Sequence, residues 1–230
     1  MEQDLFPVEI VPAGDELRAD HALRLVRQNR ALLWHGDYRN ARQLLAAMGR
    51  RLDRRPREAG RTPSDTFHDY RQAVAQRAHV LSRVLVELGP DYHLALPHAP
   101  DVSSACLQAF GPLTERLVLP LPELLGVLGA HQWRIRGVRV PVLDQAVHPH
   151  YSVFAPTRQE YLDLVAEAPL PPAKTVFDIG TGTGVLALLL AHRGAGHVVA
   201  TDIEARAVVC ARDNVSRHGL DDRVSVEQTD

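Results

Sequence analysis

The sequence predicts an α/β protein in which a doubly wound parallel sheet, incomplete in this chain, follows a mainly α-helical N-terminal domain and a short β connector. Three observations support this fold class. Apolar residues recur at helical spacing before residue 130, apolar and basic residues alternate over residues 133–140, and short strands alternate with helices after residue 157. Strands that alternate with helices are typical of a parallel sheet.

The composition is that of a globular protein. Of 230 residues, 45% are hydrophobic and 23% are charged, which excludes disordered and fibrous classes. The longest apolar run, Val185 to Ala191, is far shorter than the roughly 20 residues of a membrane helix, so we expect no membrane partner. From the acidic N-terminal residues we expect no secretory leader, and Cys106 and Cys210 are too few for a disulfide framework. We therefore expect a cytoplasmic protein with two buried, free thiols.

The N-terminal part is expected to be a flexible lead-in, residues 1–17, followed by a helical substrate-recognition domain, residues 18–130. Thr62 can cap the third helix of this domain, Pro63 suits its first turn, and Gly89 and Pro90 end it. The expected helices cover residues 20–34, 38–54, 62–89, 103–110 and 122–130. The third helix has a stripe of residues expected to be buried: Phe67, Val74, Ala78, Leu81, Val84, Leu85 and Leu88.

The β connector is expected over residues 131–155, with Gly137 as a bulge in a strand or hairpin. The N-terminal half of the ligand-binding domain follows over residues 156–230. We expect its strands at 175–179, 198–201 and 223–227, and its helices at 158–167, 185–193 and 205–218.

Positive charge is concentrated in the first half of the chain. Fifteen Arg and six acidic residues lie between Arg18 and Arg83, whereas the other residues carry 11 basic and 22 acidic groups. This distribution indicates a surface that faces a polyanion. Five Arg between Arg50 and Arg57 can complement a helix dipole or contact nucleic acid, and both interpretations stay open. The aromatic residues that would stack on single-stranded bases are few, and we assign Trp34, Tyr38, Phe67 and Tyr70 mostly to the core.

A glycine-rich turn carries the most informative pattern. Asp178 to Gly184 reads D-x-G-x-G-x-G, directly between an expected buried strand and a helix. Glycine permits positive φ and a close approach of ligand to backbone, and the helix N-terminus presents amide donors. A dinucleotide fingerprint would need glycine at Val185, and a P-loop would need a Gly-Lys-[Ser/Thr] end. The spacing fits neither of these two motifs. We therefore expect the turn to bind a nucleoside ligand of another kind.

Acidic residues follow the next two strands. Asp202 is placed to accept hydrogen bonds from both ribose hydroxyls, and Asp230 could meet an adenine amino group. Because the carboxyl ends of parallel strands meet at one edge, Asp178, Asp202 and Asp230 would line one crevice. In the alternative interpretation, these acids only cap helices.

Residues 150–230 resemble the cofactor half of a class I S-adenosylmethionine-dependent methyltransferase. The segments FDIGTGTGVLALLLA, VVATDIEARAVVCARDNVSRHGL and RVSVEQTD are similar to the small methyltransferase domain group, which includes ribosomal-RNA guanine-N and release-factor glutamine methyltransferases. The resemblance implies a Rossmann-like sheet and S-adenosylmethionine as cofactor. The residues that it implies as cofactor-binding are Asp178, Gly180, Thr181, Gly182, Thr183, Gly184, Asp202, Ile203 and Asp230, with Phe154, Pro156 and Arg158 at the methionine end.

One motif of that group is absent from this sequence. An Asn-Pro-Pro-aromatic segment normally follows the fourth strand, but none of Asn29, Asn40 and Asn214 precedes a proline. The catalytic residues therefore stay unassigned, and we expect a fragment of a longer polypeptide rather than a degenerate relative. The strand beginning at Arg223 is then expected to present an open edge.

We expect an S-adenosylmethionine-dependent N-methyltransferase that acts on RNA, in the first place ribosomal RNA. A protein glutamine amide of the translation apparatus is the alternative acceptor, and a non-catalytic module that binds S-adenosylmethionine or RNA is the alternative class. His148 and His150 form an H-x-H pair, but two ligands without a nearby third predict no metal site.

Overall fold

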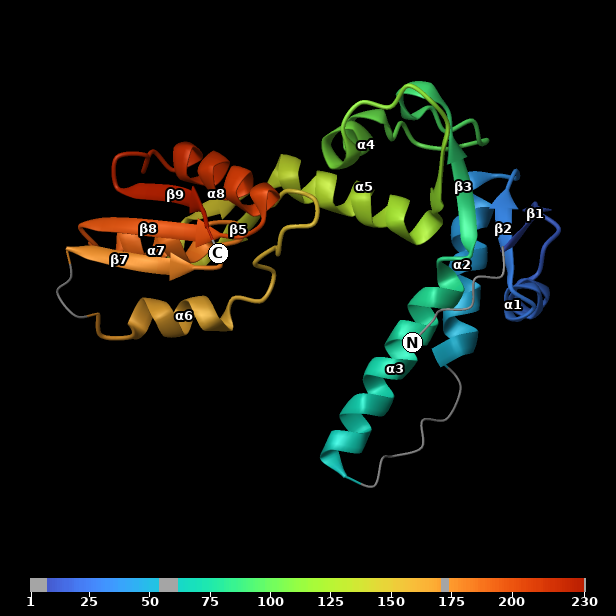
Figure 1. Cartoon of the computed structure of the whole chain (residues 1–230), viewed down its shortest axis with the longest axis horizontal. Helices are drawn as coiled ribbons and strands as arrows, with labels where there is room; N and C mark the ends of the chain where they lie inside the picture. The colour runs from blue at the N-terminus through green and yellow to red at the C-terminus, as the bar shows by residue number, and fades with distance from the viewer. Residues whose placement is uncertain (1–7, 54–61, 171–173, 230) are drawn as a thin grey trace. The chain divides into compact units, whose positions relative to one another are not determined.

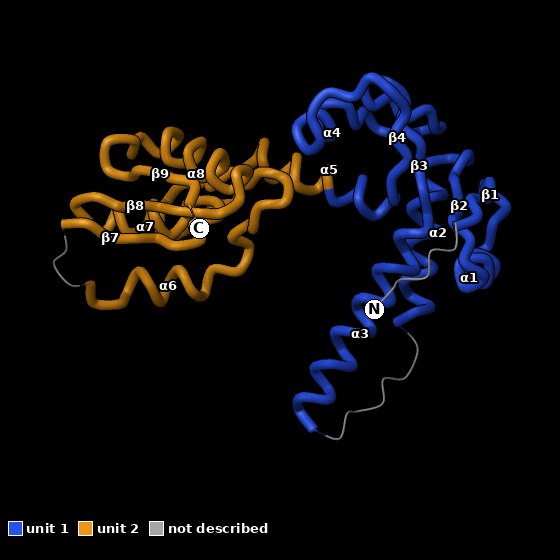
Figure 2. The backbone as a smooth tube through the Cα atoms, viewed as in Figure 1, with its two compact units in different colours: residues 1–126 blue, residues 127–230 orange. Residues whose placement is uncertain are grey.

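A computed structural model describes residues 8–53, 62–170 and 174–229 of the chain. The contacts divide the chain into two compact units, residues 1–126 and 127–230, shown in different colours in Figure 2. The boundary falls inside helix α5 (Leu121–Arg136). Among the described residues, no helix has the length and apolar character that crossing a membrane requires.

The N-terminal unit contains a four-stranded sheet in the order β1-β2-β3-β4. Strands β1, β2 and β3 run parallel, and β4 pairs antiparallel with β3. The strands and helices of this unit are β1 (Glu9–Ala13), α1 (Ala19–Arg27), β2 (Arg30–Trp34), α2 (Tyr38–Asp53), α3 (Pro63–Leu81), β3 (Val84–Leu88), a 3₁₀ turn (Pro90–Tyr92), α4 (Ser103–Phe110) and β4 (Leu117–Pro120) (Figure 1).

The helices of this unit form largely where the sequence predicts them, but the four-stranded sheet between them was not predicted. Residues 30–34 and 84–88 are strands rather than the ends of helices, and residues 9–13 are a strand rather than lead-in. Helix α1 stops at Arg27 because Asn29 adopts a left-handed backbone with φ 61°. In β3, buried and half-buried residues alternate strictly, which is the period of a strand.

Helix α3 begins where it was predicted to begin. Thr62 Oγ1 accepts a hydrogen bond from the Asp65 amide at 3.1 Å, and Asp65 Oδ2 accepts one from the Thr62 amide at 3.0 Å. The predicted buried stripe was wrong in the first turns, because Phe67 and Val74 are 56% and 44% exposed. Burial begins near the end of the helix, at Leu81.

The C-terminal unit contains a three-stranded parallel sheet in the order β7-β8-β9 and a short antiparallel hairpin, β5 with β6. The alternation of strands and helices confirms the predicted α/β class. After α5 the elements are β5 (Val138–Val140), a 3₁₀ turn (Pro141–Leu143), β6 (Gln145–Val147), α6 (Glu160–Glu167), β7 (Thr175–Ile179), α7 (Val185–His192), β8 (His197–Asp202), α8 (Ala205–Arg217) and β9 (Val224–Gln228).

The connector begins later than its alternating pattern predicts. Residues 133–136 belong to α5, so the strand prediction was wrong there. Gly137 has φ 74°, and its amide donates to the carbonyl of Trp133 at 2.8 Å. Gly137 therefore ends a helix rather than forming a bulge in a strand.

The core of the C-terminal unit lies on one face of the β7-β8-β9 sheet. Helices α7 and α8 pack there against Val198, Ala200, Val224 and Val226. Side chains of the opposite face are more exposed, with Phe177 at 64% and Ile179 at 76%. Both β7 and β9 are edge strands of this sheet. The open edge predicted at β9 exists, but the exposed large apolar side chains lie on β7.

Candidate cofactor site

The glycine loop connects β7 to α7 in the C-terminal unit. Gly180, Gly182 and Gly184 have φ values of 75°, 56° and 81°, which lie in the left-handed region that favours glycine. The amides of Gly180 and Thr181 both donate to the carbonyl of Thr201 at 2.8 Å. The loop is therefore held against the end of β8 by backbone hydrogen bonds.

The three glycines differ in the space around them. A Cβ atom on Gly180 or Gly182 would meet nothing within 4 Å, whereas one on Gly184 would lie 3.3 Å from Cα and Cβ of Ala211. Gly184 thus permits close packing of the loop against α8. Gly180 and Gly182 leave open space beside the backbone, which is the fit that a ligand cradle requires.

Asp178 supports the loop from inside. This residue is 7% exposed, and its Oδ2 accepts hydrogen bonds from the Thr181 hydroxyl at 2.7 Å and the Ala187 amide at 3.1 Å. Burial raises the pKa of Asp178, and the nearby charge of Asp202 adds to the rise, while the two hydrogen bonds oppose it. The carboxyl group fixes the start of α7 relative to the glycine loop.

Asp202, at the end of β8, faces the same loop. Its Oδ2 accepts a hydrogen bond from the Gly182 amide at 2.9 Å, and its Oδ1 accepts one from the Glu204 amide at 3.0 Å. A carboxylate has about four lone-pair sites. Asp202 therefore retains acceptor capacity on both oxygens next to the open side of the loop.

The other predicted cofactor residues lie in different surroundings. Thr181 and Thr183 are buried in the loop, Ile203 is 62% exposed, and Phe154 is 67% exposed rather than packed in the core. Arg158 is exposed and Pro156 is buried in the segment before α6. Among the described residues, no hydrogen bond or ion pair joins Phe154 or Arg158 to the loop. Asp230 lies outside the described residues, but the amide of the preceding Thr229 donates to the Asp202 carbonyl at 3.2 Å.

Asn214 has a structural role that its sequence context does not predict. This residue is fully buried on α8, and its Nδ2 donates to the carbonyls of Thr183 at 3.0 Å and His148 at 3.2 Å. Its Oδ1 accepts a hydrogen bond from the His148 amide at 2.8 Å. Asn214 thereby joins the glycine loop to the segment after β6. The signal in the sequence is a single amide on the apolar face of a helix.

The two histidines of the H-x-H pair have separate partners. His148 Nδ1 lies 2.7 Å from the Arg134 carbonyl, and His150 Nε2 lies 2.9 Å from Asp213 Oδ2. Burial lowers the pKa of His150, the positive charge of Arg134 lowers it further, and Asp213 opposes the change. In the part of the chain that the structure describes, no group of three or more His, Cys, Asp or Glu side chains could hold a metal ion.

Comparison with known proteins places the same segment among methyltransferases. The sequence model of the ribosomal protein L11 methyltransferase family matches residues 156–230. A ribosomal protein L11 methyltransferase of Pelotomaculum thermopropionicum is 49% identical over 57 residues, which is 25% of this chain and 18% of the relative. A tRNA1(Val) (adenine(37)-N6)-methyltransferase of Phocaeicola vulgatus is 43% identical over 67 residues, which is 29% of each.

Among solved structures, the ribosomal protein L11 methylase of Lactobacillus delbrueckii subsp. bulgaricus is 31% identical, with a TM-score of 0.30 over 34% of this chain and 40% of that chain. The chain spans about a fifth of the length of the L11 methyltransferase relatives, since the match covers 18% or 19% of each of the first three. Residues 156–230 are thus similar in sequence to methyltransferases.

Proposed function

We propose that this chain binds S-adenosylmethionine at the glycine loop and serves N-methylation of a component of the translation apparatus. The observation that carries the proposal is the open space at Gly180 and Gly182 beside the carboxylate of Asp202. The loop backbone would cradle the cofactor, Asp202 would accept hydrogen bonds from its ribose, and Asp178 would hold the loop in place. Asp230 would approach the adenine. The bound cofactor supplies an electrophilic methyl group.

The contribution of this chain is orientation of the two reactants. Methyl transfer to a nitrogen needs chiefly alignment of donor and acceptor, and alignment alone can lower a barrier by roughly 7–11 kcal/mol. Asp178 and Asn214 act as positioning residues, because each ties the glycine loop to a helix through buried hydrogen bonds. The acceptor-binding residues are not assigned.

RNA is the acceptor that the charge distribution favours. The 15 Arg and six acidic residues between Arg18 and Arg83 give this part of the chain an excess of nine positive charges. Phosphate contacts supply affinity for RNA without specifying a sequence. The relatives' names include a tRNA and a ribosomal protein as substrates. A cytoplasmic location, where both occur, is part of this proposal.

A protein acceptor is the second candidate. It is favoured by the family match, because that family is named for methylation of ribosomal protein L11. The side-chain amide of a glutamine in a translation protein is one acceptor of this kind. A module that binds the cofactor without transferring its methyl group is the third.

The cofactor site is tested by calorimetry with S-adenosylhomocysteine on the full chain. We expect binding, and we expect Asp202→Asn to weaken it by tenfold or more, because a neutral amide accepts ribose hydrogen bonds less strongly than a carboxylate. Asp222→Asn is the matched control, because Asp222 is an exposed acid of the same unit. Absence of binding, or equal affinity of the Asp202→Asn variant, would refute the site.

The acceptor is tested by transfer of a radiolabelled methyl group. The full chain is incubated with labelled S-adenosylmethionine and, separately, ribosomal RNA, tRNA and ribosomal proteins. Label in RNA supports the first candidate and label in protein supports the second. Binding of S-adenosylhomocysteine without transfer to any of them supports the non-catalytic module.

A further inference from the structure

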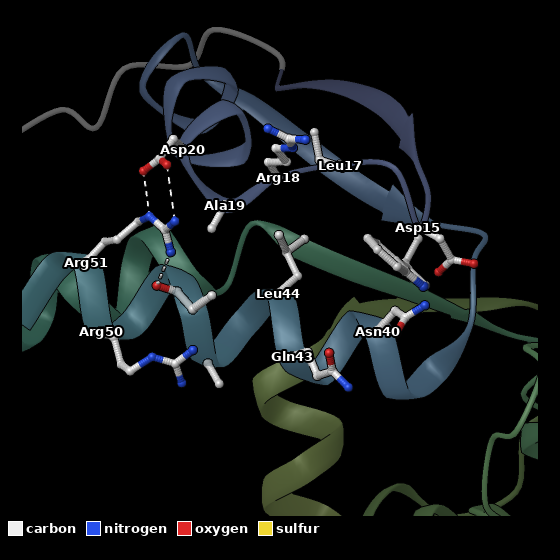
Figure 3. A pocket seen from close by; sticks show the side chains of 13 residues that line it. Asp15, Leu17, Arg18, Ala19, Asp20, Asn40, Gln43, Leu44, Arg50 and Arg51 are labelled. Atoms are coloured by element: carbon white, nitrogen blue, oxygen red, sulfur yellow. Dashed lines mark hydrogen bonds and ion pairs between the residues drawn. The ribbon is translucent and has the colours of Figure 1, made fainter.

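A cavity of about 640 Å³ lies in the N-terminal unit, between the N-terminal end of α1 and one face of α2 (Figure 3). Its walls include Leu17 and Arg18, which precede α1, and Asn40, Gln43, Leu44 and Arg50 of α2. Cavities of roughly 300–1,000 Å³ are the size that holds small-molecule ligands. The cavity belongs to a different unit from the glycine loop, and the proposed cofactor does not account for it.

The acidic groups at the cavity already have partners. Arg51 Nε and Nη2 donate to the two carboxylate oxygens of Asp20 at 2.5 and 3.1 Å, which the dashed lines in Figure 3 mark. Asp15 Oδ1 accepts a hydrogen bond from the Asp37 amide at 2.9 Å. By contrast, the side chains of Arg18 and Arg50 make no recorded ion pair or hydrogen bond with any described residue. Two guanidinium groups without partners in a concave site favour an anion.

The face of α2 at the cavity combines small and amide side chains. Asn40, Gln43, Ala47 and Arg50 recur three, four and three residues apart, which places them on one side of the helix. Ala47 leaves room between the larger neighbours, and the amides of Asn40 and Gln43 have no recorded partner within the described ranges. An amide carries both donors and acceptors.

An apolar floor lies beneath these polar groups. Leu44 is 6% exposed and Trp34 is 2% exposed, and Leu17 is half-buried at the opposite wall. The cavity thus offers positive charge for an anion and amides for a polar edge, with the half-buried side chain of Leu17 as an apolar part of its wall.

We propose that this cavity binds one nucleotide unit. The guanidinium groups of Arg18 and Arg50 suit a phosphate, since arginine pairs with phosphate through parallel N–H donors. The amides of Asn40 and Gln43 suit the donor and acceptor edge of a base, and the half-buried side chain of Leu17 can contact its apolar face. The nucleotide can be part of an RNA strand or free in solution. That the bound nucleotide belongs to an RNA strand rests on the proposed function, in which RNA is the methyl acceptor. That the cavity binds a nucleotide does not depend on that function.

The test uses the full chain and a fluorescently labelled single-stranded RNA 10-mer, with AMP and inorganic phosphate as competitors. Binding is followed by fluorescence anisotropy. We expect Arg18→Gln and Arg50→Gln each to weaken binding by tenfold or more. The matched control is Arg27→Gln, which removes the same charge from an exposed position on α1 and is expected to change binding by no more than twofold.

A second pair of variants guards against loss of fold. Asn40→Ala and Gln43→Ala keep the charge and favour helix, and they are expected to weaken binding of RNA by about threefold to tenfold. Competition by AMP at the concentration of RNA nucleotides would identify a free nucleotide as the source, and weak competition would identify RNA. An equal loss in the Arg27→Gln variant, or no binding of RNA or AMP, would overturn the proposal.

The same variants separate this proposal from that for the cofactor site. Affinity for S-adenosylhomocysteine is measured on each, and it is expected to be unchanged in all four cavity variants. Nucleotide binding without S-adenosylhomocysteine binding refutes only the proposal that the glycine loop binds the cofactor. S-adenosylhomocysteine binding without nucleotide binding refutes only the proposal that the cavity binds a nucleotide.

Discussion

The side-chain amide of Asn214 donates a hydrogen bond to the carbonyl of Thr183, 31 residues earlier, at 3.0 Å. The same side chain accepts a hydrogen bond from the amide of His148, 66 residues earlier, at 2.8 Å. Both groups are backbone atoms of segments that form neither helix nor strand. A single buried residue therefore replaces the regular hydrogen bonds that these segments lack.

Replacing Asn214 with alanine is expected to lower the free energy of unfolding by about 2–4 kcal/mol. The substitution removes the hydrogen-bond partner of the buried Thr183 carbonyl and of the part-buried His148 amide, and each buried group without a partner costs about 1–3 kcal/mol. Affinity for S-adenosylhomocysteine should fall with it, because Thr183 belongs to the glycine loop. Urea unfolding and calorimetry measure the two effects. Arg206→Ala, at an exposed position of α8, should change stability by no more than about 0.5 kcal/mol. Similar losses in both variants would contradict the role of Asn214.

Gly182→Ala is expected to weaken S-adenosylhomocysteine binding by tenfold or more. The added methyl group would point into the open space beside the loop, where the ligand is proposed to lie. A left-handed conformation also costs an alanine about 1 kcal/mol of stability. Gly219→Ala isolates that cost, because Gly219 has φ 65° and equally open surroundings at the end of α8. Calorimetry should show weaker binding for the Gly182 variant alone, and equal binding by both variants would argue against the loop as a cradle.

Asp178 makes the stability of the C-terminal unit depend on pH. Because burial raises its pKa above 3.8 in the folded protein, the folded state keeps a proton that the unfolded state has released. The carboxyl group therefore destabilises the folded state progressively as the pH rises from 3.8 to the raised pKa. In Asp178→Asn this effect is absent, and an amide oxygen can still accept from Thr181 or Ala187.

The expected result is a stability difference that grows with pH. The free energy of unfolding of Asp178→Asn minus that of the unsubstituted protein should increase from pH 4 upward, by at most about 1.4 kcal/mol per pH unit, and then level off. Urea unfolding at several pH values measures it. A difference that stays constant with pH would show that Asp178 is not desolvated in the folded state.

The C-terminal elements could be predicted because their signals are local. The D-x-G-x-G-x-G spacing, the three strands and the two helices between them each occupy a continuous segment with clear ends. The predicted bounds of β7, β8 and β9 agree with the observed ones within one residue. The position of Asp202 beside Gly182 followed from the rule that parallel strands end at one edge.

Other features depend on information that a local pattern does not contain. Strands β2 and β3 follow α1 and α3 after two residues, so their apolar residues continue the helical spacing and were assigned to the helices. Phe67 and Val74 fit an amphipathic stripe, yet the pattern does not tell how far the sheet extends under a 19-residue helix. The bond between Asn214 and His148 joins residues 66 apart.

Strand β7 is expected to drive self-association of this chain. Phe177 and Ile179 are exposed on one face of the sheet, and β7 has one strand neighbour, β8, among the described residues. An edge strand with large exposed apolar side chains is a template for pairing with another chain. Phe177→Lys should therefore lower the fraction of associated protein at a given concentration, because it places a charge on that edge. Sedimentation velocity across a concentration series measures this fraction.

Val209→Lys provides the comparison for Phe177→Lys. Val209 is 51% exposed on α8, so the substitution adds the same charge and removes an exposed apolar side chain without touching the sheet edge. If exposed apolar area or net charge alone controlled association, both variants would reduce it equally. Because backbone groups at the edge of β7 can pair with a second strand and those of α8 are already bonded within the helix, only Phe177→Lys is expected to have a large effect.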